Sequence, residues 1–146
     1  MPTEILSVPA RRVVLVDARA DRRQLMRLVV TGDDAHAVLV GEADSKASAV
    51  EAVDKGQADV ALVDVHMPIS EGMATIAALR RTYPAIGIIA CSFDLDPATV
   101  QQALAQGADS CLAKPVNRND VHVALGKLPN PEGGRLAPLP VAAAAR

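Results

Sequence analysis

The chain has very few aromatic residues, since only one of its 146 residues is Phe, one is Tyr and none is Trp. Half of the sequence is nonetheless apolar, so Val, Ile, Leu, Ala and Met side chains must build the hydrophobic core. An aliphatic core of this kind is typical of a sheet covered by helices. The shortage of aromatic rings also argues against a module that stacks nucleic-acid bases.

Cysteine, net charge and long apolar runs are equally scarce. Cys91 and Cys111 are too few for a disulfide framework, and their spacing fits neither a metal site nor a dithiol redox motif. A net charge of −2 provides no basic field for nucleic acid. No stretch approaches the roughly eighteen apolar residues of a membrane span, and residues 1–10 lack a secretory signal pattern. We therefore expect a cytoplasmic protein with no membrane and no direct nucleic-acid partner.

The length fits one compact domain with short extensions. Residues 13–128 are predicted to form this domain, preceded by an N-terminal extension over residues 1–12. Residues 129–146 hold four of the ten prolines, a Gly-Gly pair and a run of alanines. This composition predicts a flexible tail or a linker.

Short aliphatic runs alternate five times with segments of helical periodicity. The predicted strands are residues 13–16, 37–40, 60–65, 86–91 and 110–113. The predicted helices begin at Ala20 or Asp21, at Asp44 or Ser45, after Gly72, at Asp96-Pro97, and at Asn117 or Asn119. The alternation predicts an α/β fold with a doubly wound five-stranded parallel sheet.

Periodicity also predicts which helix faces are buried. The first helix is expected to bury Leu25, Leu28 and Val29, which recur at positions i, i+3 and i+4. The arginine pairs at 22–23 and 80–81 are expected to lie on solvated helix surfaces.

Four polar groups stand at the predicted carboxyl ends of strands, where side chains converge on one crevice in such a fold. They are Asp17, Asp64, Ser92 and Lys114. Strand-end Asp residues often serve only turn geometry, and a carboxylate beside an ammonium is often a structural ion pair. Together the four groups suit phosphoryl transfer to an Asp nucleophile, with a cation, an ammonium and a hydroxyl to hold the phosphoryl oxygens.

The segment 59–68, DVALVDVHMP, followed by Glu71-Gly72, is similar to the phosphorylation-site signature of bacterial two-component receiver domains. The resemblance covers residues 13 to about 128, with further matches at 13–17 (VVLVD), 88–92 (IIACS), 106–109 (QGAD) and 114–115 (KP). It implies the (βα)5 flavodoxin-like receiver fold with strand order 2-1-3-4-5, and a signalling module that is not an enzyme.

The resemblance also implies roles for individual residues. Asp64 matches the phospho-acceptor, while Ser92 and Lys114 match the Ser/Thr and the Lys that contact the phosphoryl group. The peptide bond before Pro115 is then expected to be cis, an isomer that only proline makes accessible. A histidine kinase or phosphotransfer protein would be the phosphodonor, and the partner controlled would be an output protein or an effector domain.

A Mg²⁺ site is implied too, with one departure from the family pattern. Asp17, Asp64 and the backbone carbonyl of His66 match metal ligands, whereas Ala18 stands where the family has a second acidic residue and leaves that ligand position vacant. Mg²⁺ binding is therefore expected to be weak or absent. The guanidinium of Arg19 either substitutes for the metal beside Asp17 or Asp64, or points to solvent.

A second departure concerns the position of the aromatic residue that turns inward when many receivers are activated. Cys111 stands there, so the usual coupling to Ser92 is in doubt and simple core packing is the alternative. By analogy, the face of the fourth helix, fifth strand and fifth helix, including Val100, Leu104, Cys111 and Val121, would form a homodimer or meet an output.

Three hypotheses of different classes follow. The first is a receiver that takes a phosphoryl group on Asp64 and switches conformation. The second, favoured by Ala18, is a pseudo-receiver that acts as a protein-interaction module without phosphorylation. The third, a small α/β enzyme, has no positive support, because the sequence lacks the nucleotide-binding and esterase motifs of such folds.

Overall fold

The computed structural model describes residues 10–31, 37–66 and 69–128. The predicted tail, residues 129–146, lies outside the described residues, as do most of the predicted extension and Gly32, the expected end of the first helix. Among the described residues, no helix has both the length and the apolar character that a membrane span requires.

Five strands and five helices alternate in the described part of the chain. They are β1 (Arg11–Val16), α1 (Ala20–Val30), β2 (Ala37–Ala43), α2 (Lys46–Gly56), β3 (Val60–Asp64), α3 (Ile69–Thr82), β4 (Gly87–Ser92), α4 (Pro97–Gln106), β5 (Ser110–Ala113) and α5 (Arg118–Gly126). All strand pairs are parallel, and the sheet order is β2-β1-β3-β4-β5. The predicted fold class and strand order are confirmed.

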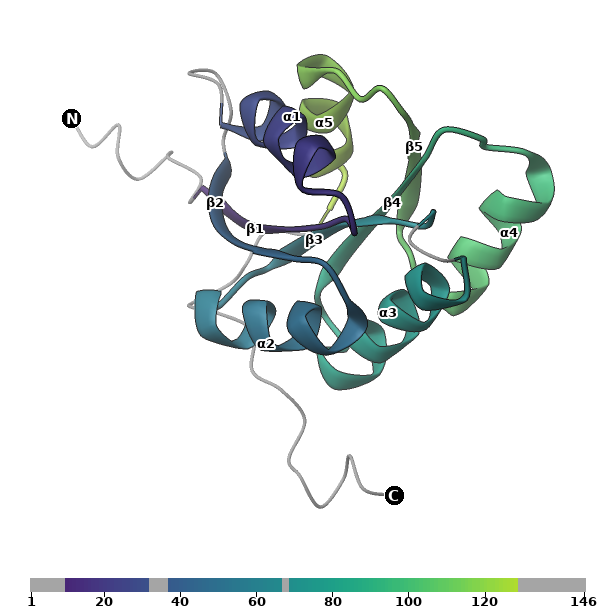
Figure 1. Ribbon diagram of the computed structural model, residues 1–146, viewed down its shortest axis with the longest axis horizontal. Coiled ribbons are helices and arrows are strands. Elements are labelled where there is room, and N and C mark those ends of the chain that lie inside the picture. Colours follow the sequence, from purple (N-terminus) through teal and green to yellow (C-terminus); the bar gives the residue numbers. More distant parts are fainter. Residues whose placement is uncertain (1–9, 32–36, 67–68, 129–146) are drawn as a thin grey trace.

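The sheet divides the core into two layers. Figure 1 shows α1 and α5 on one face of the sheet and α2, α3 and α4 on the other. Each face has its own cluster of buried side chains, made almost wholly of Val, Ile, Leu, Ala and Met as the composition predicts. The largest fully buried side chains include Leu15, Ile76, Leu79, Ile86 and Ile88.

Several helices begin at the caps that the sequence predicts. Ser45, Asp96 and Asn117 each accept a hydrogen bond from a backbone N–H in the first turn of α2, α4 and α5. The helix α3, by contrast, begins at Ile69 and not after Gly72. A Cβ atom at Gly72 would lie only 2.7 Å from the Cα of Val65. This glycine, which lies inside α3, therefore lets the helix pack closely against the backbone at the end of β3.

The buried face of α1 differs from the prediction. Met26 and Val30, four residues apart, are the buried pair, while Leu25 and Leu28 are each 64% exposed. Val29, the third residue of the predicted set, is half-buried and packs against the core. The run LMRLVV offers apolar residues on more than one face, so periodicity alone misplaces Leu25 and Leu28. Two leucines are consequently left on the surface.

Arg80 does not lie on a solvated surface as expected. Its guanidinium donates hydrogen bonds to the carbonyls of Pro84, Ile86 and Gly107, and pairs with Asp109 at 2.9 Å. Backbone carbonyls that the adjoining turns leave without partners thus find a donor in the arginine. Arg81 is exposed, as predicted.

Candidate functional site at the carboxyl ends of the strands

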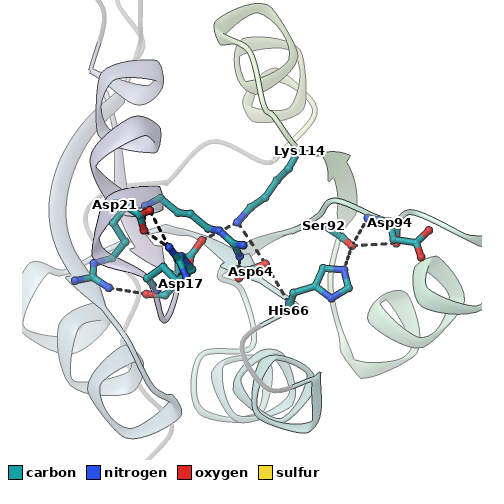
Figure 2. A network of polar contacts seen from close by, with 10 residues as sticks. Asp17, Asp21, Asp64, His66, Ser92, Asp94 and Lys114 are labelled. Carbon is teal, nitrogen blue, oxygen red and sulfur yellow. Dashed lines mark hydrogen bonds and ion pairs between the residues drawn. The ribbon is translucent and has the colours of Figure 1, made fainter.

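Four strands deliver the predicted polar groups to one edge of the sheet. Asp17 follows β1, Asp64 and Ser92 end β3 and β4, and Lys114 follows β5. Figure 2 shows Lys114 reaching toward Asp17 and Asp64, with Ser92 to one side of them beside His66. Asp17, Asp64 and Ser92 are 3%, 2% and 0% exposed, so the polar groups are largely shielded from water.

Lys114 joins the two carboxylates. Its Nζ lies 2.6 Å from Oδ2 of Asp17 and 3.3 Å from Oδ1 of Asp64, and its side chain is only 6% exposed. The peptide bond between Lys114 and Pro115 is cis, as the resemblance implies. Because a buried charge is costly without a partner, the ammonium and the two carboxylates depend on one another.

The two oxygens of the Asp64 carboxylate have different surroundings. Oδ1 accepts a hydrogen bond from the backbone N–H of His66 at 3.0 Å and also faces Lys114. Oδ2 is buried and has no hydrogen-bond partner. The Arg22 guanidinium forms an ion pair with Oδ2, and its Nη1 lies 3.8 Å away, which is too long for a hydrogen bond.

Both carboxylate oxygens of Asp17 are engaged. Oδ1 accepts from the backbone N–H of Arg19 at 2.9 Å, and Oδ2 accepts from Lys114. The backbone carbonyl of Asp17 accepts a 2.6 Å hydrogen bond from Arg23, which also pairs with Glu42 of β2. Arg23 therefore holds the β1–α1 loop to the neighbouring strand and does not lie on a solvated surface as predicted.

Ser92 is held away from the carboxylates. Its Oγ lies 2.6 Å from Nε2 of His66 and exchanges hydrogen bonds with the backbone of Asp94. Sequence reasoning assigned only the backbone carbonyl of His66 a role, and no pattern in the sequence reveals the contact between its ring and Ser92. The imidazole links the end of β3 to the end of β4.

Arg19 does not take the position of a metal substitute. Its guanidinium hydrogen-bonds to both oxygens of Asp21 at 3.1–3.2 Å, and this pair is well exposed. The hydrogen bond from Arg19 lowers the pKa of the Asp21 carboxyl. Arg19 is the residue before α1, with an extended backbone, so its side chain leaves the crevice where the helix begins.

Arg22 and Phe93 are the residues at the crevice that sequence reasoning missed. The Arg22 guanidinium lies 5.0 Å from the centre of the Phe93 ring, and Nζ of Lys114 lies 5.4 Å from it. Contacts of this length between a cation and a ring face are attractive. The one available signal is position: Phe93 directly follows Ser92, and Arg22 stands in the first turn of the helix after Asp17.

The groups that could hold Mg²⁺ are an incomplete set. Ala18 is exposed and offers no side-chain oxygen, and the described residues contain no group of three or more His, Cys, Asp or Glu side chains placed for a metal ion. Asp17 and Asp64 already face two cations, Lys114 and Arg22. Mg²⁺ prefers octahedral oxygen ligands. The described side chains therefore do not fit this ion as they stand.

Cys111 is half-buried on β5 and packs against the aliphatic core cluster. Burial raises the pKa of its thiol, and it raises the pKa of Cys91 to about 12. Both thiols are therefore protonated near neutral pH, as expected of core residues.

The predicted interaction face of α4, β5 and α5 is only partly a surface. Leu104 is 45% exposed and Val100 is half-buried, but Val121 is 3% exposed and packs into the core between α5 and the sheet. Val121 is therefore not part of that face. Val123 lies on the exposed side of α5 instead, at 46% exposure.

Comparisons with known proteins point to one family. Residues 13–126 match the family model of the response regulator receiver domain. The chemotaxis protein CheY of Thermotoga maritima is 30% identical over 118 residues, which are 81% of this chain and 97% of that protein. A protein-glutamate methylesterase/protein-glutamine glutaminase of Cereibacter sphaeroides is 30% identical over 117 residues, which are 79% of this chain. The chain spans about a third (31%) of that methylesterase's length.

Solved structures agree with this. The signal receiver domain of the response regulator NarL from Mycobacterium tuberculosis has a TM-score of 0.67 and 33% identity, covering 79% of this chain and 92% of that one. The response regulator domain of Thermotoga maritima CheB has a TM-score of 0.64 and 24% identity, covering 80% of this chain and 90% of that domain, and supports the fold alone. Since the family model covers most of the sequence, the chain belongs to the response regulator receiver domain family.

Proposed function

We propose that this receiver accepts a phosphoryl group on Asp64 from a histidine kinase or a phosphotransfer protein in the cytoplasm, and thereby controls an output protein or effector domain. The observation that carries the proposal is the buried Oδ2 of Asp64, which has no hydrogen-bond partner. An oxygen without a donor keeps its lone pairs for attack on phosphorus, while Lys114 and the His66 N–H hold Oδ1 in place.

The chemical step is a substitution at phosphorus. Oδ2 of Asp64 forms the new O–P bond as the N–P bond of the donor phosphohistidine breaks. The leaving imidazole keeps the electron pair of that bond and takes a proton from solvent. Lys114, already 3.3 Å from Asp64, is placed to neutralise the charge on the transferred phosphoryl oxygens.

The conformational switch is proposed to begin at Ser92. To reach a phosphoryl oxygen on Asp64, its hydroxyl must leave Nε2 of His66 and the backbone of Asp94. The loop that carries Asp94 leads directly into α4 through the cap at Asp96. Movement of Ser92 would therefore pull on the start of α4, which borders the proposed output and homodimer face.

Receiver domains typically bind Mg²⁺ in their acidic pocket, and here Asp17, Asp64 and the His66 carbonyl are the residues that match its ligands. Without an oxygen at Ala18, and with Lys114 and Arg22 in place, this pocket is poorly suited to the ion. We therefore assign this chain weak Mg²⁺ binding at most.

The phosphodonor is proposed to dock on α1. Leu25 and Leu28 leave apolar surface exposed, and Phe93, at 55% exposure, continues it to the edge of the crevice. A groove lined by Met26, Val29, Phe93, Pro115 and Val116, among others, lies between them. A helix of the donor protein with apolar residues toward this groove would bring its phosphohistidine to Asp64.

A pseudo-receiver is the second candidate, and Ala18 is the observation that favours it. Without the second acidic ligand, the domain could serve as a phosphorylation-independent interaction module. Catalysis is not part of either candidate, because the receiver family is a signalling family. The similarity to methylesterases also spans only about a third of their length.

The deciding experiment is intact mass measurement after incubation of the full chain with a small acyl phosphate or phosphoramidate, with and without Mg²⁺. The proposed receiver gains the mass of one phosphoryl group, and Asp64→Asn gains none. Ser92→Ala serves as a second variant that keeps the acceptor carboxylate. Failure of the wild type to gain mass under any condition overturns phosphoryl acceptance and leaves the pseudo-receiver.

A further inference from the structure

The acidic pocket contains a positive charge that is supplied by the chain itself. Nη1 of Arg22 lies 3.8 Å from Oδ2 of Asp64, the carboxylate oxygen that has no hydrogen-bond donor. A buried carboxylate oxygen without a donor is costly unless a cation stands near it. Arg22 is a cation in ion-pair contact with that oxygen.

The guanidinium is also held in place. It lies over the Phe93 ring at 5.0 Å, and the Arg22 side chain is 33% exposed, compared with 59% for Arg19. A planar, weakly hydrated guanidinium on an aromatic face loses little hydration, so the ring favours this position over open solvent. The contact with the ring thus supports the position of Arg22 beside Asp64.

Charge balance gives an independent reason. The pocket holds two carboxylates, Asp17 and Asp64, and two cations, Lys114 and Arg22. A third cation, Arg23, also lines it, but its charge is paired with Glu42. A divalent ion would add two positive charges to a set that is already neutral, at a place where Ala18 supplies no ligand. The ion would be repelled strongly by Lys114 and Arg22, because the crevice that holds these charges is poorly hydrated.

We propose that the Arg22 guanidinium takes the place of the divalent cation at Asp64, so that it neutralises the carboxylate and excludes Mg²⁺. The inference deepens the proposed phosphoryl acceptance and rests on it for its functional meaning. During transfer, Arg22 would hold phosphoryl oxygens in the manner of an arginine finger, and no metal ion would be required.

The first test is Mg²⁺ titration by calorimetry at fixed ionic strength, which needs no phosphorylation. Arg22→Ala is expected to bind Mg²⁺ at least about tenfold more tightly than the wild type, because the competing charge is gone. Arg19→Ala is the matched control, since it removes an arginine three residues away whose guanidinium pairs with Asp21. The proposal is overturned if wild type and Arg22→Ala bind Mg²⁺ with equal affinity. It is also overturned if Arg19→Ala gains as much Mg²⁺ affinity as Arg22→Ala.

Phe93→Leu is a second test variant, and it keeps the charges of both Arg22 and Asp64. Loss of the ring releases the guanidinium, so Mg²⁺ affinity is expected to rise in the same direction and by a smaller factor. Arg22→Lys keeps the charge but loses the planar contact with the ring. Its Mg²⁺ affinity is expected to lie between those of the wild type and Arg22→Ala. An Arg22→Lys variant that binds Mg²⁺ less tightly than the wild type, or more tightly than Arg22→Ala, contradicts a role for the guanidinium.

The second test separates this inference from the proposed function. With a small acyl phosphate and a chelator, the wild type is expected to gain one phosphoryl group, whereas Arg22→Ala is slowed about 100-fold and recovers with Mg²⁺. Uptake by the wild type that depends wholly on Mg²⁺ contradicts the inference. If neither the wild type nor Arg22→Ala gains a phosphoryl group with or without Mg²⁺, the proposed phosphoryl acceptance is wrong. The Mg²⁺ titration then still shows whether Arg22 excludes the ion.

Discussion

The two oxygens of Asp64 illustrate how single atoms decide the behaviour of this site. Oδ1 is fixed by the His66 N–H and Lys114, while Oδ2 accepts no hydrogen bond and has the Arg22 guanidinium at 3.8 Å. One oxygen therefore anchors the side chain and the other is available for chemistry. Ala18 completes the picture at this scale, because its methyl group replaces an oxygen that a metal ion would need.

The vacancy at position 18 predicts the effect of refilling it. Ala18→Asp is expected to raise Mg²⁺ affinity by at least about tenfold, since a direct ligand should matter no less than the outer partners of metal sites. Titration of Mg²⁺ at fixed ionic strength measures this. Ala20→Asp adds the same charge at an exposed position on α1 and should change the affinity much less. Equal affinity of Ala18→Asp and wild type would show that position 18 does not face the metal.

At the scale of elements, the structure differs most clearly from the sequence-based prediction at α1. The caps at Ser45, Asp96 and Asn117 follow from local patterns. Four strands end within one residue of the predicted position, which brings Asp17, Asp64 and Lys114 together, whereas β2 runs on to Ala43 and does not end at residue 40. The direction of Arg22 does not follow from local patterns, because helix phase depends on which apolar residues pack on the sheet. Arg22 and its neighbour Arg23 are the same residue type, and only the phase sends one to Asp64 and the other to Glu42.

Exposure of two leucines on α1 leads to a prediction about the donor. Leu25→Asp is expected to slow phosphotransfer from a phosphohistidine-bearing partner about tenfold or more, because an apolar docking contact becomes charged. Uptake from a small acyl phosphate should stay unchanged, since that donor needs no docking. Val123→Asp, on the exposed side of α5, is the control. Equal slowing with both donors would place Leu25 in the chemistry and contradict a docking role.

Close packing of α3 against Asp64 and Val65 gives a stability prediction. A Cβ at Gly72 would meet the Asp64 carbonyl at 2.8 Å and the Val65 Cα at 2.7 Å. Gly72→Ala is therefore expected to lower the free energy of unfolding by about 1–3 kcal/mol in urea denaturation, as overpacked cores do. Gly126→Ala meets nothing within 4 Å and should be neutral or slightly stabilising. A neutral Gly72→Ala would mean that α3 can withdraw from the loop at little cost.

At the scale of the whole molecule, the two ends of the folded unit are fastened to each other. Arg11, the first residue of β1, is 5% exposed and donates hydrogen bonds to the carbonyls of Leu125 and Leu128. Leu128 is 7% exposed and packs into the core between α5 and the sheet. The composition predicts the boundary near residue 128, but the start at 13 lies two residues inside the strand. An apolar run marks only the buried middle of β1, and a charged side chain such as Arg11 gives no sign of its burial.

These contacts predict the limits of the stable domain. A chain of residues 11–128 is expected to keep the melting temperature of the full chain within a few degrees, whereas residues 13–128 should melt distinctly lower, because the hydrogen bonds of Arg11 and Arg12 are lost. Thermal unfolding followed by circular dichroism compares the two. Equal melting temperatures for the two truncated chains would show that Arg11 and Arg12 together contribute little.

The central claim is that Asp64 carries a phosphoryl group, and identification of the modified residue tests it most directly. Reduction of an aspartyl phosphate with borohydride leaves homoserine, which peptide mapping locates in the sequence. After incubation of the full chain with a phosphodonor, we expect homoserine at position 64 and at no other acidic residue. Unchanged Asp64 alongside a gain of one phosphoryl mass, or homoserine at another position, would contradict the account.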